Sequence, residues 1–202
     1  MNHGLALVEA GAWSVGMVLL DAMEKCSGVR LLQLELNDGP GVCLKLAGPL
    51  ANLASALEMG RVAAGSMGVS IVTDLIPAPS PLSNPAWQAV PDFNPLIEQP
   101  TVFDPEKIMT QHKGFALGLI ETQGYIAVFE AIDTALKTAA VEVVAREKLG
   151  GGFITVVIKG DVAAVRAAID AGKARVEGLG KLIAAHVIPN PSEGVLSLLP
   201  KV

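Results

Sequence analysis

The sequence is poor in aromatic residues, basic clusters and cysteines, and each shortage excludes a class of protein. Aromatic residues fill 4% of the 202 positions, whereas hydrophobic residues as a whole fill 51%. We therefore expect a core of tightly packed small side chains rather than a large aromatic pocket. The net charge is −5 and no basic run occurs. This balance argues against nucleic acid as a partner, because phosphate backbones require clustered Lys and Arg.

Long apolar runs and targeting signals are missing as well. No apolar stretch reaches the roughly 20 residues that span a bilayer, and the N-terminus lacks the charged and apolar regions of a signal peptide. We expect a soluble cytoplasmic protein without membrane contact. The two cysteines, Cys26 and Cys43, lack CxxC spacing. We interpret both as small buried hydrophobic residues and expect no disulfide and no metal site.

What the sequence does contain is a repeat of itself, offset by 112 residues. "LALVEA" at 5–10 aligns with "LGLIET" at 117–122, and "LIPAPS" at 75–80 aligns with "VIPNPS" at 187–192. We predict two copies of one domain, at 3–83 and 113–199. Residues 84–112 contain five prolines and are predicted to be a linker, because proline fixes φ and removes a hydrogen-bond donor.

Each copy is predicted to run strand, helix, strand, strand, helix, strand. Alternating apolar residues indicate the second and third strands, at 29–36 and 42–48 and again at 141–148 and 153–160. Asp161 is predicted to cap the second helix, and Gly60 and Gly172 are expected to interrupt or end that helix in the two copies. This order is typical of the ferredoxin-like α+β fold, in which two helices cover one face of a sheet.

Three consecutive glycines stand between the second and third strands of the second copy. A phosphate-binding loop requires a strand, the glycines and then a helix, so this loop, which joins two strands, is not of that type. We interpret the glycines as a turn that needs positive φ or a close backbone approach. Three glycines exceed what a tight turn requires, which favours a second cause, such as crowding of several loops at a symmetry axis.

The repeat resembles a known family. The segments that carry the resemblance are "GFALGLIETQGYIAVFEAIDTALKTAAVEVV" (114–144), "GGGFITVVIKGDVAAVRAAIDAG" (150–172) and "HVIPNPSEGV" (186–195). They are similar to the bacterial microcompartment (BMC) shell-protein domain, and the first copy shows the same likeness more weakly. Two such domains in tandem imply a homotrimer, whose six domains form a flat pseudohexameric tile.

The resemblance also implies a central pore for small metabolites, lined by the two equivalent loops. The pore-lining residues would be Asn37, Asp38, Gly39 and Pro40 in one loop and Gly150, Gly151 and Gly152 in the other. Asp38 either binds a cation at the axis or only stabilises its own turn. Some tandem members hold an iron–sulfur cluster on a cysteine of the first loop. This loop has no cysteine, so we predict no cluster and no other cofactor.

The tile edge is the third implication. Lys25 and Lys137 match the family's edge lysine, although a solvated lysine at a helix C-terminus is the alternative. Ala78 and Asn190 stand where the family often has an arginine. That difference is consistent with a tile that needs other shell proteins as neighbours rather than assembling alone.

We therefore expect a structural protein and not an enzyme. His3, His112 and His186 are scattered and show no catalytic or zinc motif. Glu9 and Glu121 occupy the same position in both copies, which favours a structural or subunit-contact role over catalysis. Two alternatives stay open: a ferredoxin-like regulatory protein that binds a small molecule, and an enzyme of the dimeric α+β barrel type, which would need a polar pocket.

Overall fold

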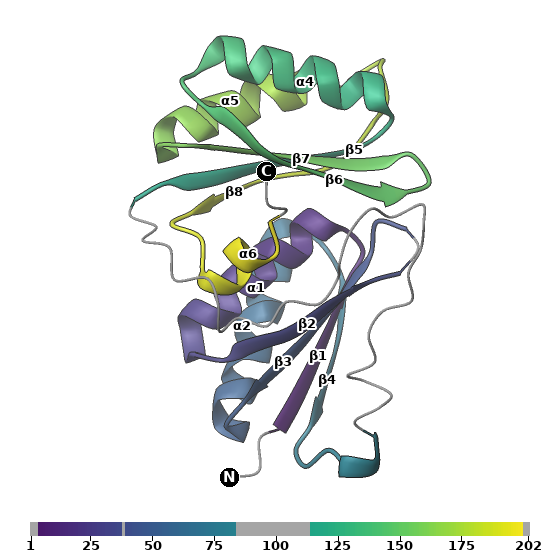
Figure 1. Cartoon of the computed structure of the whole chain (residues 1–202), viewed down its shortest axis with the longest axis vertical. Helices are drawn as coiled ribbons and strands as arrows, with labels where there is room; N and C mark the ends of the chain where they lie inside the picture. Colours follow the sequence, from purple (N-terminus) through teal and green to yellow (C-terminus); the bar gives the residue numbers. More distant parts are fainter. Residues whose placement is uncertain (1–3, 38, 84–113, 200–202) are drawn as a thin grey trace.

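The computed structural model describes residues 4–37, 39–83 and 114–199, which fold as two domains of the same architecture. In Figure 1 each domain is a sheet with helices on one face, and α1 and α6 lie between the two sheets. The helices α4 and α5 cover the face of the second sheet that points away from the first domain. Asp38 lies outside the described residues, as does the predicted linker.

The first repeat is a four-stranded antiparallel sheet with two helices. Its elements are β1 (Gly4–Ala10), α1 (Trp13–Ser27), β2 (Arg30–Leu36), β3 (Val42–Gly48), α2 (Leu50–Met67) and β4 (Ile71–Ile76), followed by the 3-10 turn η1 (Pro81–Ser83). The sheet order is β2-β3-β1-β4, and all neighbouring strands are antiparallel. This is the ferredoxin-like arrangement that the sequence predicted.

The second repeat has the same topology. Its elements are β5 (Ala116–Gln123), α4 (Tyr125–Thr138), β6 (Glu142–Gly150), β7 (Phe153–Gly160), α5 (Val162–Ala174) and β8 (Lys181–Pro189), followed by the short helix α6 (Glu193–Ser197). The sheet order is β6-β7-β5-β8. Equivalent helices begin 112 residues apart, as at Trp13 and Tyr125, so the offset read from the sequence is also the structural offset.

The second helix of the second repeat begins where the sequence predicted. The Asp161 carboxylate accepts hydrogen bonds from the backbone N–H groups of Ala163 and Ala164, at 3.0 and 2.9 Å. Two of the donors that every helix leaves unpaired at its N-terminus are thereby satisfied. Pro49 takes the equivalent position before α2.

The prediction that Gly60 and Gly172 interrupt or end the second helices is wrong for Gly60, and Gly172 does not interrupt α5, which ends two residues later at Ala174. α2 continues through Gly60, and α5 continues through Gly172. A Cβ atom at Gly172 would lie 2.8 Å from the carbonyl oxygen of Ala131 in α4, and one at Gly60 would lie 3.1 Å from the sulfur of Met23 in α1. These glycines allow the two helices of each repeat to pack closely, and this benefit outweighs their low helix propensity.

The core of the first repeat extends onto the second sheet. One apolar cluster contains Met17 and Leu20 of α1 together with Leu117, Leu119 and other residues from the outer face of the second sheet. A separate cluster fills the space between that sheet and its own helices. Helix α1 is therefore buried on two sides, against its own sheet and against β5 and β8.

The cysteines differ from their predicted state. Cys26 is exposed near the end of α1, and Cys43 is half-buried on β3. The interpretation of both as buried hydrophobic residues is therefore wrong for Cys26, because this position lies on the side of α1 that neither sheet covers. Both thiols are free, and burial raises the pKa of Cys43.

Candidate functional site

The joint between the two repeats is the first candidate site, and a buried carboxylate stands at its centre. Glu121, at the end of β5, accepts two hydrogen bonds from Ser14 in the first turn of α1. Desolvation raises the pKa of Glu121, although the hydrogen bonds from Ser14 act in the opposite direction. For Glu121 the structure shows the structural alternative of the predicted role, a contact between the two repeats of one chain, whereas a subunit contact for Glu9 stays a prediction. Ser14 itself was missed, because its counterpart is Ile126 and no repeated motif marks it.

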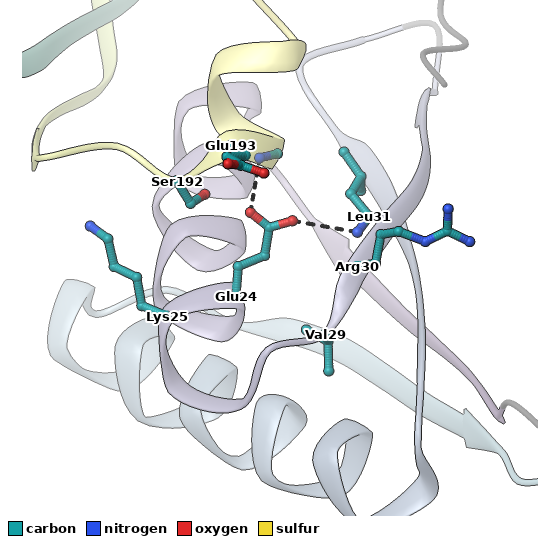
Figure 2. Close-up of a pocket in the computed structure, with 8 residues that line it drawn as sticks. Glu24, Lys25, Val29, Arg30, Leu31, Ser192 and Glu193 are labelled. Atoms are coloured by element: carbon teal, nitrogen blue, oxygen red, sulfur yellow. Dashed lines mark hydrogen bonds between the residues drawn. The ribbon is translucent and has the colours of Figure 1, made fainter. Parts of the chain in front are cut away.

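A pocket of about 540 Å³ opens beside this joint, between the end of α1, the start of β2 and α6 (Figure 2). Glu24 points into it and accepts hydrogen bonds from the backbone N–H groups of Gly194, at 3.0 Å, and Leu31, at 3.4 Å. Burial is the largest influence on Glu24 and raises its pKa, while these bonds lower it. Both carboxylate oxygens are used to hold α6 and β2, so the acid of this pocket has a structural role.

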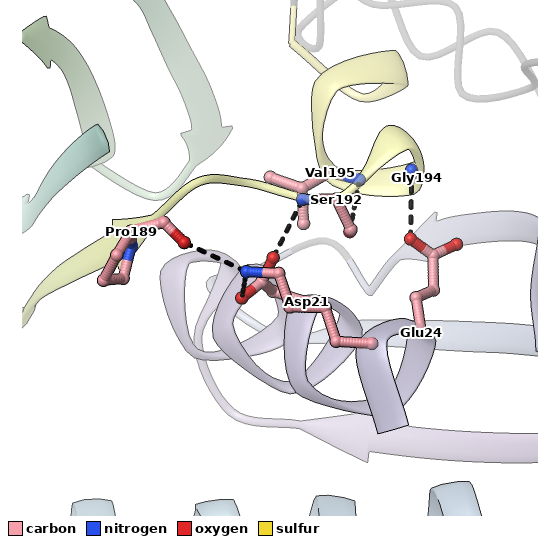
Figure 3. Close-up of polar contacts among 7 residues, drawn as sticks. Asp21, Glu24, Pro189, Ser192, Gly194 and Val195 are labelled. Carbon is pink, nitrogen blue, oxygen red and sulfur yellow. Dashed lines mark hydrogen bonds and ion pairs between the residues drawn. The ribbon is translucent and has the colours of Figure 1, made fainter. Parts of the chain in front are cut away.

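The segment before α6 is anchored to α1 by a second polar group (Figure 3). The backbone N–H of Ser192 donates to Asp21 at 2.8 Å, and the Lys25 ammonium donates to Asp21 at 2.7 Å and to the carbonyl oxygen of Pro189 at 3.0 Å. Ser192 in turn caps α6. These contacts place Lys25 at the joint, and together with Glu24 they fasten the C-terminal segment across α1.

The glycine loop adopts the backbone conformation that the sequence predicted. Gly150, Gly151 and Gly152 have φ values of 83°, 56° and 80°, the left-handed region in which a Cβ atom is disfavoured. The carbonyl oxygens of Gly151 and Gly152 accept from the Gln123 side chain and from the Gly124 N–H. In Figure 1 the β6–β7 hairpin and the β2–β3 hairpin extend toward the same side of the molecule.

The loop of the first repeat is built differently. Asn37 donates its backbone N–H to the carbonyl oxygen of Gly41 at 3.2 Å, which closes the turn. Gly41 does not have a positive φ, and a Cβ atom there would meet only the flexible end of the Asn37 side chain. Gly39 and Pro40 are half-buried, and Asn37 is exposed. The two candidate pore loops thus present different chemistry.

The remaining predicted edge residues lie on the surface. Lys137 is exposed and pairs with Asp133 one turn before it, as Lys25 pairs with Asp21. Ala78 and Asn190 are exposed, and Asn190 adopts a left-handed φ of 50°. Their role at a tile edge stays a prediction.

One buried acid was not anticipated. Glu147 on β6 is 1% exposed, and neither carboxylate oxygen has a hydrogen-bond partner among the described residues. Desolvation raises its pKa to about 8. Its counterpart Glu35 pairs with Lys45, whose own counterpart is Val157. The loss of that lysine was the signal in the sequence that sets Glu147 apart.

Two further observations concern metal-binding groups and membrane-spanning helices. Within residues 4–37, 39–83 and 114–199, no three His, Cys, Asp or Glu side chains are grouped so as to hold a metal ion. None of the helices that the structure describes is both long and apolar enough to cross a membrane.

Comparison with known families gives two matches within this chain. The BMC domain family matches residues 4–79 and, a second time, residues 116–191. The two matches together cover most of the sequence, and each corresponds to one repeat of the structure.

Comparison with individual proteins agrees. The chain is 49% identical over 86 residues to the bacterial microcompartment shell protein PduA of Citrobacter freundii, a match that covers 43% of this chain and 92% of that protein. It is 43% identical over 94 residues to the major carboxysome shell protein CsoS1A of Halothiobacillus neapolitanus, covering 46% and 96%. A solved microcompartment protein from Desulfitobacterium hafniense DCB is 26% identical, covers 97% of this chain and 99% of its own, and has a TM-score of 0.39.

Proposed function

The chain belongs to the BMC domain family, and from this premise we propose that three copies form a tile with a central pore for small metabolites. The protein is a structural shell protein of a bacterial microcompartment, located in the cytoplasm as part of the shell. The observation that carries the proposal is the joint between its repeats. That joint buries helix α1 and the outer face of the second sheet. Their counterparts, helix α4 and the outer face of the first sheet, are not covered within the chain.

The uncovered helix is α4, the counterpart of α1. Tyr125, Ile126, Phe129 and Leu136 on α4 are between 41% and 70% exposed. Their counterparts Trp13, Ser14 and Met17 are buried, and Glu24 is half-buried against α6. An apolar stripe of this size on a surface helix indicates an interaction site.

The uncovered sheet face is the outer face of the first sheet. Val72 on β4 is 67% exposed and stands opposite the exposed Glu9 on β1. The counterparts of this pair are Ala184 and Glu121, which lie beneath α1 at the joint. We infer that α4 of one copy packs on this face of the next copy, as α1 packs on the second sheet, with Glu9 accepting from the backbone N–H of Ile126.

Such a contact is heterologous, since the two surfaces that meet are different, and repeated application closes a ring or extends a filament. Closure with three copies gives six domains around one axis. The loops of Asn37, Asp38, Gly39 and Pro40 then alternate with those of Gly150, Gly151 and Gly152 around the pore. Other shell proteins are expected to contact the tile edge near Lys25, Lys137, Ala78 and Asn190.

The test is the mass of the native protein in solution, followed by electron microscopy. Three times the chain mass of 20.9 kDa and ring-shaped particles with a central hole are the expected results. A monomer or dimer at all accessible concentrations would leave no axis for the loops and would overturn the proposal.

A further inference from the structure

The in-chain joint ends in a polar contact that constrains both of its members. The Glu24 carboxylate accepts from the Gly194 N–H at 3.0 Å (Figure 3). A Cβ atom at Gly194 would lie between 2.3 and 2.6 Å from the atoms of that carboxylate. Only a residue without a side chain therefore lets Glu24 reach the backbone at this point.

In the other half of the chain, both members of this pair are leucine. The counterpart of Glu24 is Leu136, and the counterpart of Gly194 is Leu82. The neighbouring polar group keeps its identity, because Asp21, Lys25, Pro189 and Ser192 correspond to Asp133, Lys137, Pro77 and Ser80. The residue types of the anchor are thus repeated, while the neighbouring pair changes from a glutamate and a glycine to two leucines.

The two leucines are presented for contact. Leu82 is 92% exposed on the turn η1, and Leu136 is 42% exposed on α4. Within one chain α4 faces away from the first repeat (Figure 1). Glu24 contacts Gly194 within the chain, and the residues at the equivalent positions are Leu136 and Leu82. If the contact between copies repeats the in-chain joint, the η1 segment of a second copy lies on α4, with Leu82 opposite Leu136.

We propose that Leu136 of one copy and Leu82 of the next form the contact that selects which repeat meets which. This inference rests on the proposed ring. Two other pairings are conceivable, α1 with the segment of Leu82 and α4 with the segment of Gly194, and both are unfavourable. Helix α1 against a Leu82 segment puts the Glu24 carboxylate on an apolar side chain without its amide donor. Helix α4 against a Gly194 segment leaves Leu136 above a position that has no side chain to bury it. The two pairs therefore favour rings in which each chain keeps its own joint over assemblies in which chains exchange these surfaces.

The first experiment measures concentration-dependent mass by sedimentation for the wild type, Leu136→Glu, Leu82→Gly and the double variant. Each single change is expected to weaken association at least about tenfold. The double variant recreates the Glu24 and Gly194 pair and is expected to recover association relative to Leu136→Glu. Leu50→Glu is the matched control, since Leu50 is 44% exposed on α2 and lies outside the inferred contact.

The outcomes separate the two proposals. A wild type that stays monomeric overturns the ring and this contact with it. A wild type that associates, with Leu136→Glu associating as Leu50→Glu does, overturns the leucine contact alone.

A second experiment tests directly whether the two positions meet in the associated protein. A chain carrying both Leu136→Cys and Leu82→Cys is oxidised and run on a denaturing gel. Linked species of two and three chains are expected when both changes are made in a chain that also carries Cys26→Ser, because Cys26 is an exposed free thiol. They are expected to be absent when either new cysteine is omitted. Association without links between chains would show that the two positions do not meet.

Discussion

Ser14 donates two hydrogen bonds to a single oxygen of Glu121, from its backbone nitrogen at 2.8 Å and from its hydroxyl at 2.6 Å. The serine lies in the first turn of the first helix of one repeat, and the glutamate lies near the end of the first strand of the other. Both side chains are fully buried. A carboxylate at a helix N-terminus also interacts favourably with the helix dipole. This pair fixes the position of α1 on the second sheet.

We predict that Ser14→Ala destabilises the protein by about 1–3 kcal/mol, because Glu121 loses a hydrogen bond that it cannot replace with water. Urea unfolding at fixed protein concentration measures the change. The matched control is Ser55→Ala, which removes an exposed hydroxyl on α2 and is expected to stay within about 0.5 kcal/mol of the wild type. Equal effects of the two changes would contradict a special role for Ser14.

Glu147 makes one contribution to the pH dependence of stability, in addition to those of Glu24 and Glu121, whose pKa values burial also raises. Burial raises the pKa of Glu147 to about 8 in the folded protein, from the 4.5 of an exposed glutamate. Below pH 4.5 the carboxyl is protonated in both the folded and the unfolded state. Between pH 4.5 and 8 the unfolded state releases the proton and the folded state retains it, so stability falls by about 1.4 kcal/mol per pH unit.

Glu147→Gln removes this titration. The variant is expected to match the wild type near pH 4 and to exceed its stability near pH 8, as measured by unfolding across this range. Glu177→Gln, at an exposed position, is the control and is expected to leave the slope unchanged. A wild-type profile that is flat from pH 4.5 to 8 would show that Glu147 is not held neutral.

Two helix glycines give predictions of opposite sign. Gly172→Ala is expected to destabilise by about 1–3 kcal/mol, because the new Cβ meets the Ala131 backbone. Gly65→Ala on α2 meets no atom within 4 Å and is expected to stabilise by about 0.4–1 kcal/mol through helix propensity. Thermal or urea unfolding of the two variants provides the test, and a stabilising Gly172→Ala would show that α4 and α5 have room to move apart.

The proposed pore makes Asp38 a determinant of charge selectivity. Asp38→Ala removes three negative charges from the axis of a trimer, so passage of anionic solutes through assembled shells is expected to rise relative to cationic solutes. Solute flux into purified shells measures this ratio. Asp170→Ala, on the exposed face of α5, is the control. An unchanged ratio would indicate that Asp38 serves only its own turn.

The topology could be predicted from the sequence because the 112-residue offset appears in every element. The positive φ values of Gly150 to Gly152 could also be predicted, because glycine is the residue that adopts this conformation without strain. The joint could not be predicted, because its contacts connect residues of different repeats. Ser14 and Gly194 differ from their counterparts, so no periodic signal marked them. Gly60 was misinterpreted since helix propensity is local and helix packing is not.

The covalent connection between the two halves of the in-chain joint has a consequence for assembly. These two halves belong to one chain, so they meet at an effective concentration on the order of millimolar, whatever the dilution. The leucine contact between copies has no such tether, and its occupancy varies with protein concentration. Dilution should therefore open rings at Leu82 and Leu136 and release whole chains, each with its two domains still joined. The smallest building block of the tile is then a preassembled domain pair, and growth or repair of the tile adds domains two at a time.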